Sequence, residues 1–209
     1  MKLKSVPYGS PKYWNERYKA ETCGFEWYPG ADETLCKAFK EHLPGIGREA
    51  GSESVLEIGS GSSELAYKLW QCSSSSIIVT DISATVIETM KHKWKDQTET
   101  SIQFAVVDCC KIPCRESSFE AVVDKGTLDA IDCTDDRNTN LCLSEVHRVL
   151  RSGGLYFLVS CREPGVRRQD VHDLFDILSI VEVRSNPDLK LPCPDAYLYI
   201  MKKVNAAAH

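Results

Sequence analysis

The stretch VLEIGSGSSELA, residues 55–66, decides which fold this chain adopts. Its first four residues are apolar or β-branched apart from one glutamate, as in a buried strand, and a glycine turn and a helical pattern follow directly. Glycines at such a turn let the backbone bend sharply and let a ligand approach without a Cβ in the way. The stretch therefore predicts a strand, a turn and a helix built around a ligand.

Outward from this stretch, short apolar runs alternate with helical patterns along the rest of the chain. Seven strands are predicted, at 54–58, 76–80, 101–107, 119–124, 154–160, 178–184 and 196–202. Helices are predicted at 11–19, 31–43, 63–71, 83–95, 138–150 and 167–176. Because strands and helices alternate through the first five strands, these strands should form a parallel sheet.

The last two predicted strands are joined only by the loop 186–195, which favours an antiparallel hairpin at the end of the sheet. The helix at 138–150 should stop at the Ser152-Gly153-Gly154 turn. The predicted fold class is α/β, a Rossmann-like, seven-stranded, mostly parallel sheet with helices on both faces and this C-terminal hairpin. The length of 209 residues predicts one domain, 1–209.

Composition excludes several other classes of protein. Ten cysteines are scattered without any CxxC pair, which argues against a zinc ribbon or a thioredoxin-like site, and no metal is expected. There is no apolar leader and no run long enough to span a bilayer, so we expect a cytosolic or nuclear protein with reduced thiols and no membrane partner. A net charge of −5 argues against a nucleic-acid partner.

Two cofactor classes use a glycine turn of this kind. A dinucleotide binder needs a third glycine where this chain has Glu64, and a carboxylate there would repel a pyrophosphate. A methyltransferase needs no phosphate site, because its cofactor carries an amino acid and a sulfonium. Glu57 would offer that positive end a negative group, with Gly59 and Gly61 forming the turn.

Two aspartates make the pattern more specific than the glycines alone. Asp81 ends the second strand, where a carboxylate can accept both ribose hydroxyls, although both cofactor classes share this feature. Asp108 follows the third strand and can accept from an adenine amino group, while Cys109 offers its backbone amide. All these residues lie at carboxyl ends of strands, where open sheets bind ligands.

Three segments carry a family resemblance that covers most of the chain: YWNERY (13–18), VVDKGTLDAI (122–131) and LSEVHRVLRSGG (143–154). They resemble the seven-β-strand protein methyltransferases grouped around the elongation factor 1-alpha lysine methyltransferases, and citrate synthase lysine methyltransferase shares the DKGT-like segment. The resemblance implies S-adenosyl-L-methionine as cofactor, a protein lysine as acceptor, an elongation factor 1-alpha-like partner and a cytoplasmic location.

The resemblance also implies roles for individual residues. Residues 1–50 would form a helical lid over a core of 51–209, with Trp14, Tyr18 and Trp27 closing over the cofactor. Gly59 would contact its amino-acid part, Asp81 and Ile82 its ribose, Asp108 and Cys109 its adenine, and Lys125 would line the site. For the aromatic residues the alternative is that Tyr13, Trp14 and Tyr18 only anchor an amphipathic helix on the core.

Asp124 and Asp129 flank the place where a methyl acceptor would arrive, so either could orient an amine or help remove its proton. The alternative for Asp129 is a purely local cap. Glu163–Lys190 departs most from the family and is expected, with the N-terminal segment, to select the substrate.

Three rival functions stay open at this point. A nicotinamide-dependent reductase would need a Tyr-x-x-x-Lys pair on a helix, yet Tyr8/Lys12 and Tyr199/Lys203 lie in a leader and a strand. A small-molecule methyltransferase would have a closed apolar acceptor pocket. A cofactor-binding scaffold without turnover would keep the cofactor residues alone.

Overall fold

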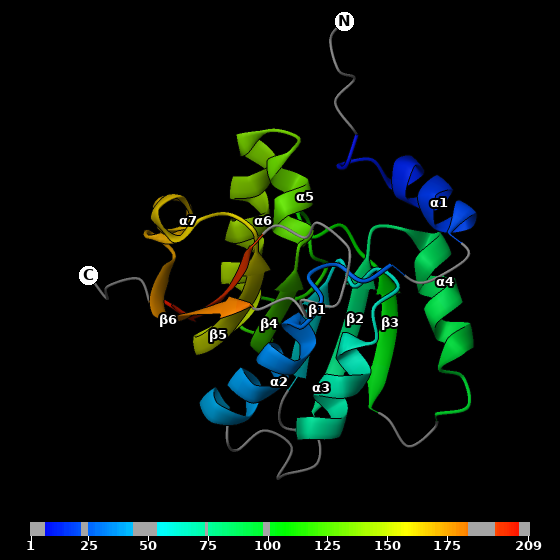
Figure 1. Cartoon of the computed structure of the whole chain (residues 1–209), viewed down its shortest axis with the longest axis horizontal. Coiled ribbons are helices and arrows are strands. Elements are labelled where there is room, and N and C mark those ends of the chain that lie inside the picture. The colour runs from blue at the N-terminus through cyan, green and yellow to red at the C-terminus, as the bar shows by residue number, and fades with distance from the viewer. Residues whose placement is uncertain are drawn as a thin grey trace, which may run out of the picture.

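Seven strands form one sheet in the order β3-β2-β1-β4-β5-β7-β6, with helices on both faces (Figure 1). The structure is a computed structural model that describes residues 7–21, 25–43, 54–73, 75–97, 101–183 and 195–204. The strands are β1 (Ser54–Ile58), β2 (Ser76–Asp81), β3 (Ile102–Val106), β4 (Phe119–Lys125), β5 (Leu150–Ser160), β6 (Phe175–Val183) and β7 (Ala196–Lys203). Strands β1 to β5 pair in parallel, whereas β7 pairs antiparallel with β5 and β6. The predicted fold class is confirmed.

The helices divide between the two faces of the sheet. They are α1 (Pro11–Ala20), α2 (Ala31–His42), α3 (Leu65–Ser73), α4 (Ala84–Lys93), α5 (Thr127–Asp132), α6 (Asp136–Val149) and α7 (Pro164–Val171). Helices α2 and α3 lie in front of the sheet in the view of Figure 1, and α5 and α6 lie behind it. Helix α1 stands apart at the upper edge, beside α4.

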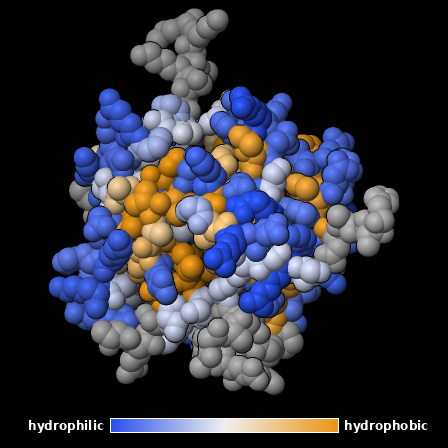
Figure 2. All heavy atoms as spheres, turned by 180° about the vertical axis from the view of Figure 1, so that it is seen from behind, coloured by the Kyte–Doolittle hydropathy of each residue, from blue (hydrophilic) through white to orange (hydrophobic). Residues whose placement is uncertain are grey.

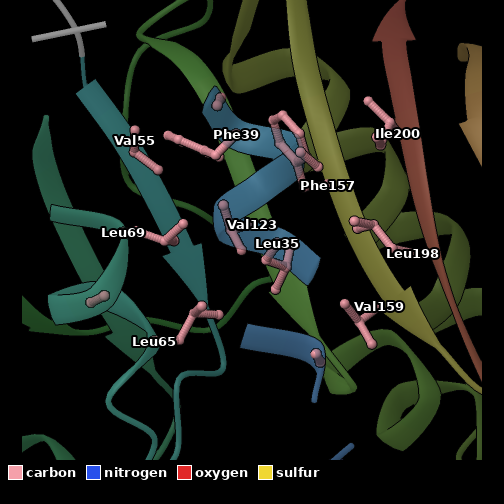
Figure 3. Close-up of a cluster of buried hydrophobic side chains, with 14 of the residues drawn as sticks. Leu35, Phe39, Val55, Leu65, Leu69, Val123, Phe157, Val159, Leu198 and Ile200 are labelled. Atoms are coloured by element: carbon pink, nitrogen blue, oxygen red, sulfur yellow. The ribbon is translucent and has the colours of Figure 1, made fainter. Parts of the chain in front are cut away.

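Strands β1, β4 and β5 in the middle of the sheet bury alternate residues against opposite helix layers, as the two-residue period of a strand requires. Figure 3 shows the front core, where Val55, Val123 and Phe157 pack against α2 and α3. The neighbouring residues Leu56 and Tyr156 belong to the rear core with α6. The same alternation separates the two charged residues that end β4, because Asp124 must face the rear layer and Lys125 the front.

Several details differ from the sequence-based prediction. Helix α5 was not predicted, since six residues are too few to show a helical period. Strand β5 begins at Leu150, directly after α6, with an irregular register opposite Phe119–Ala121, whereas a turn at Ser152–Gly154 was expected. Helix α7 spans Pro164–Val171 instead of 167–176, because a proline fits the first turn of a helix, and residues 175–176 belong to β6.

The rear face carries an apolar area framed by hydrophilic side chains (Figure 2). No helix in the described part of the chain is long and apolar enough to cross a membrane. Most of the predicted loop 186–195, part of the lid and residues 184–190 of the expected substrate-selecting segment lie outside the described residues.

Candidate functional site

A cavity of about 360 Å³ opens at the carboxyl ends of the parallel strands. Its floor comes from the glycine loop after β1 and from the residues that end β2, β3 and β4, and its roof from the N-terminal segment. The lining includes most of the expected cofactor residues, namely Trp14, Tyr18, Trp27, Gly59, Gly61, Asp81, Ile82, Asp108, Cys109 and Lys125. Asp129 also lines it, whereas Glu57 and Asp124 do not.

The glycine loop is shaped by close neighbours on two sides. Gly59 has a φ of +59°, and a Cβ there would lie 2.0 Å from the hydroxyl of Thr127. That hydroxyl donates to the carbonyl of Ile58 at 3.0 Å, which ties the DKGT segment to the loop. Gly61 has a φ of +56°, and a Cβ there would lie 2.8 Å from the hydroxyl of Tyr18. Only glycine leaves this cradle open.

Asp81 is fixed at the end of β2 by backbone amides. Its two carboxylate oxygens accept from Gly61 N at 2.9 Å and from Ser83 N at 2.8 Å. Burial raises the pKa of Asp81, and the amide bonds oppose that rise. Each oxygen keeps a further lone pair beside Ile82, so the carboxylate can accept hydrogen bonds from a ligand in the cavity.

Glu57 lies behind the glycine loop, on the front face of β1. It is 2% exposed, and its Oε2 has no hydrogen-bond partner in the described structure. Burial raises its pKa to about 8, although the nearby Lys125 acts to lower it. A buried carboxylate with an unused oxygen suits the ammonium group of an amino-acid ligand, which would relieve both the desolvation and the missing bond.

Lys125 enters the cavity from β4 inside a ring of acidic and polar groups. Its ammonium contacts Glu26, donates to Asp32 Oδ1 at 2.7 Å and donates to Ser63 Oγ at 2.8 Å. Although burial acts to raise it, the pKa of Asp32 is held below its usual value by Lys125 and Lys68. Lys125 thus joins the roof segment to β4 and the glycine loop.

At the other end of the cavity, beyond β3, Asp108 and Cys109 lie where the adenine ring was expected. Asp108 is exposed, and its Oδ1 accepts from Cys110 N at 2.9 Å. One carboxylate oxygen therefore stays available to a ligand amino group.

The aromatic residues of the roof face the cavity instead of the core. Helix α1 buries none of its residues, so the alternative of a core-anchored helix is not what the structure shows. Trp14 donates its indole N–H to Tyr8 O at 2.6 Å and stacks on Tyr18 at 5.9 Å. Trp27 is 38% exposed at the rim.

The two candidate catalytic aspartates differ completely in their surroundings. Asp124 is fully buried in the rear layer, where it accepts from Thr127 N at 2.8 Å and from the hydroxyl of Tyr156 at 3.0 Å. Burial raises its pKa to about 7. It holds the start of α5 and does not reach the cavity.

Asp129 lies on α5 and reaches the cavity. It is more than a local cap, because its carboxylate accepts from four groups outside α5: the hydroxyls of Tyr28 and Ser160, the amide of Cys161 and the guanidinium of Arg167. Tyr28, Ser160 and Arg167 were not singled out from the sequence. Among these residues only Tyr28 lies in a segment with a recognisable sequence pattern, the Tyr28-Pro29-Gly30 turn. The contacts of Ser160 and Arg167 with Asp129 join residues far apart in the chain, which no local pattern predicts.

Most of the charged side chains that line the cavity are negative. Its carboxylates are Glu21, Glu26, Asp81, Asp108 and Asp129, whereas Lys125 is the one lysine or arginine among the described lining residues. Such a cavity favours cationic ligands and disfavours the phosphates of a dinucleotide.

Comparison with known proteins gives the following similarities. Residues 50–196 match the family model described as a methyltransferase domain. The mouse protein "eEF1A lysine and N-terminal methyltransferase" is 32% identical over 173 residues, which are 80% of this chain and 24% of that protein. The mouse "EEF1A lysine methyltransferase 4" is 27% identical over 78% of this chain and 66% of that protein. The chain thus spans about a quarter of the first of these relatives.

Among solved structures, the N-methyltransferase NodS from Bradyrhizobium japonicum with S-adenosyl-L-homocysteine superposes with a TM-score of 0.70. The alignment covers 91% of this chain and 96% of that chain at 17% identity, so it supports the fold alone.

Proposed function

We propose that this chain, which belongs to the methyltransferase domain family and is an S-adenosylmethionine-dependent methyltransferase, methylates a lysine of an elongation factor 1-alpha-like protein. The similarity to relatives named as eEF1A lysine methyltransferases supports this substrate class. Since the chain spans only about a quarter of the first of these relatives, the identity of the acceptor protein is part of this proposal.

The residues of the cavity fit the cofactor. The Gly59–Gly61 loop would cradle its amino-acid part, and Asp81 would hold its ribose, with Asp108 and Cys109 beyond. Glu57, buried behind the loop and outside the cavity lining, would pair with its ammonium directly or through water. Trp14 and Tyr18 would cover it from the roof. When bound, the cofactor supplies an electrophilic methyl group on a sulfonium, so the protein must position a nucleophile in line with it and exclude water.

The observation that carries the lysine assignment is the excess of carboxylates around the cavity. In the sheet order β1 lies between β2 and β4, so a ligand held by Asp81 at β2 leaves the β4 side for the acceptor. On that side Asp129 presents a carboxylate to the cavity. A lysine ammonium would be drawn there and would have to lose a proton before transfer.

The lid is also part of the proposal. Residues 7–21 and 25–28 would act as the cover of the cofactor, whereas α2 packs into the front core through Leu35 and Phe39. The proposed location is the cytoplasm, where thiols stay reduced, because the described part of the chain contains eight free cysteines.

Mass spectrometry of purified elongation factor 1-alpha tests the proposal, after incubation with this protein and isotopically labelled S-adenosylmethionine. With the cofactor kept near the Kd of the wild type, we expect label on one lysine with the wild type and much less with Asp81→Ala. Labelling of a small metabolite instead, in a cell extract freed of protein, would favour the small-molecule alternative. Tight cofactor binding without label on any acceptor would favour the scaffold.

A further inference from the structure

We propose that the hydroxyl of Tyr28 contacts the methyl-accepting amine and orients its lone pair, with Asp129 holding that hydroxyl in place. This inference rests on the proposed function, since it gives the amine acceptor its binding partner. Tyr28 lines the cavity at its β4 side, beside Gly126, Thr127 and Asp129.

The backbone of Tyr28 is held in a conformation that bulky residues avoid. Its φ is +54°, in the left-handed region, and Gly30 follows with a φ of +91° before α2 begins. Such a conformation costs about 1–3 kcal/mol at a non-glycine residue and persists mainly where its surroundings and function require it. Gly126 makes room for the ring, because a Cβ there would lie 2.9 Å from Tyr28 Cε2.

Within the described structure the hydroxyl of Tyr28 interacts with the carboxylate of Asp129 and with the thiol of Cys161. It donates its hydrogen to Asp129 Oδ2 at 2.5 Å, so even beside the Cys161 thiol the oxygen keeps a lone pair that can accept a hydrogen bond from a ligand. Burial, and then the charge of Asp129, raises the pKa of Tyr28 far above its usual value. The side chain therefore stays a neutral phenol, which can orient an amine but cannot act as its base.

Asp129 is itself held rigidly from the far side. Its Oδ1 accepts from Ser160 Oγ at 2.5 Å and from Arg167 at 3.1 Å. Arg167 is wholly buried and also pairs with Asp132 at 2.8 Å, so its charge is fixed behind the site. A buried charge network of this kind is costly unless its geometry is held, and here it fixes the direction of the Asp129 carboxylate.

These contacts define what Tyr28 does in the reaction. A neutral amine that donates an N–H to the Tyr28 oxygen has its lone pair turned away from that bond and toward the cofactor end of the cavity. The nitrogen lone pair then forms the new N–C bond while the electrons of the broken C–S bond pass to sulfur. The methylated nitrogen, now cationic, gives its extra proton to solvent or leaves as an ammonium.

The test compares Tyr28→Phe with Tyr67→Phe, a control whose ring stacks on Trp94 at 4.5 Å and does not line the cavity. For Tyr28→Phe we expect kcat toward the protein acceptor to fall by about 10- to 100-fold. Its affinity for S-adenosyl-L-homocysteine, measured by calorimetry, should stay within about twofold of wild type, since orientation and not cofactor binding is lost. Unchanged kcat in a folded Tyr28→Phe protein would overturn the inference and leave the proposed function standing.

A second measurement does not depend on the identity of the acceptor protein. Binding of n-butylamine, which mimics a lysine side chain, is followed by NMR in the complex with S-adenosyl-L-homocysteine. Tyr28→Phe should weaken the binding of n-butylamine by about threefold or more, because one hydrogen bond is lost, whereas Tyr67→Phe should leave it unchanged. Equal binding by both variants would count against the inference even if no protein acceptor were found.

Discussion

At the scale of single residues, Asp81 is the side chain on which cofactor affinity most clearly depends. Its oxygens are already aligned by Gly61 N and Ser83 N, so ribose hydroxyls meet a preorganised carboxylate. We expect Asp81→Ala to weaken S-adenosyl-L-homocysteine binding by about 1–3 kcal/mol, through loss of charge-assisted hydrogen bonds. Isothermal calorimetry measures this.

The matched control is Asp96→Ala, which removes an exposed aspartate outside the cavity lining. It should bind like the wild type. Equal affinity of all three proteins, with folding checked by circular dichroism, would remove Asp81 from the site.

Glu57 gives a prediction about protons. Its pKa of about 8 means that it is largely protonated at pH 7 in the free protein. An ammonium bound beside it favours the charged carboxylate, so cofactor binding should lower its pKa and release nearly one proton. Calorimetry at pH 7 in two buffers of different ionisation enthalpy measures that release.

Glu57→Gln should bind without this buffer dependence. Glu57 also makes the stability of the free protein depend on pH, because folding raises its pKa from 4.5 to about 8. The protonated side chain stabilises the fold fully below about pH 4.5, and this contribution is lost as the pH rises through about 8. The free energy of unfolding should therefore change less between these pH values in Glu57→Gln. Heats of binding that are identical in the two buffers for the wild type would contradict the assignment.

At the scale of elements, the contact between the glycine loop and α5 joins β1 to β4. Gly59→Ala would place a Cβ 2.0 Å from Thr127 Oγ1 in a left-handed conformation. We expect a loss of at least about 2 kcal/mol in the free energy of unfolding, from the conformational strain and from displacement of Thr127. Urea denaturation followed by circular dichroism measures it.

Gly165→Ala is the comparison for this substitution. Gly165 lies in α7 without any atom within 4 Å of its added Cβ, so the variant should gain up to about 1 kcal/mol from helix propensity. A Gly59→Ala protein as stable as wild type would mean that the loop and α5 are not tightly coupled.

Elements were predicted from sequence wherever their pattern is local. The β-branched runs of β1 and β2 and the apolar face of α6 are visible in the sequence, because burial on one or both faces imposes a regular period. Helix α5 is only six residues long, which is too short for a helical period to be recognised in the sequence. Its start is held by Asp124, which accepts hydrogen bonds from its first backbone amides.

The site was predictable to the extent that strand ends carry it. Asp81 and Lys125 follow apolar runs and could be placed at the carboxyl edge. The sequence did not show that Asp124 is buried in the rear layer while Lys125 enters the cavity. Which side chains of β4 face which layer is decided by packing against α2 and α6. Tyr28 meets Asp129 across 101 residues of sequence, a contact that no local pattern encodes.

At the scale of the whole molecule, the N-terminal segment and the sheet meet mainly across the cavity. Helix α1 buries no residue of its own, and Asn15 ties it to α4 by accepting from Ser83 Oγ at 2.8 Å and from Thr85 N at 3.1 Å. Trp14 and Tyr18 face the cavity, where the cofactor would fill the space between roof and floor. A helix with so little burial opens easily unless a ligand holds it.

Hydrogen exchange measures this directly. We expect saturating S-adenosyl-L-homocysteine to slow exchange in α1 by about tenfold or more, because ligand binding stabilises the closed form by mass action. Helix α7, which contributes no residue to the cavity lining, should change much less. Asp81→Ala at the same ligand concentration should show little protection of α1. If α1 exchanges at the same rate with and without ligand in the wild type, the roof does not close on the cofactor, and the N-terminal segment serves another partner.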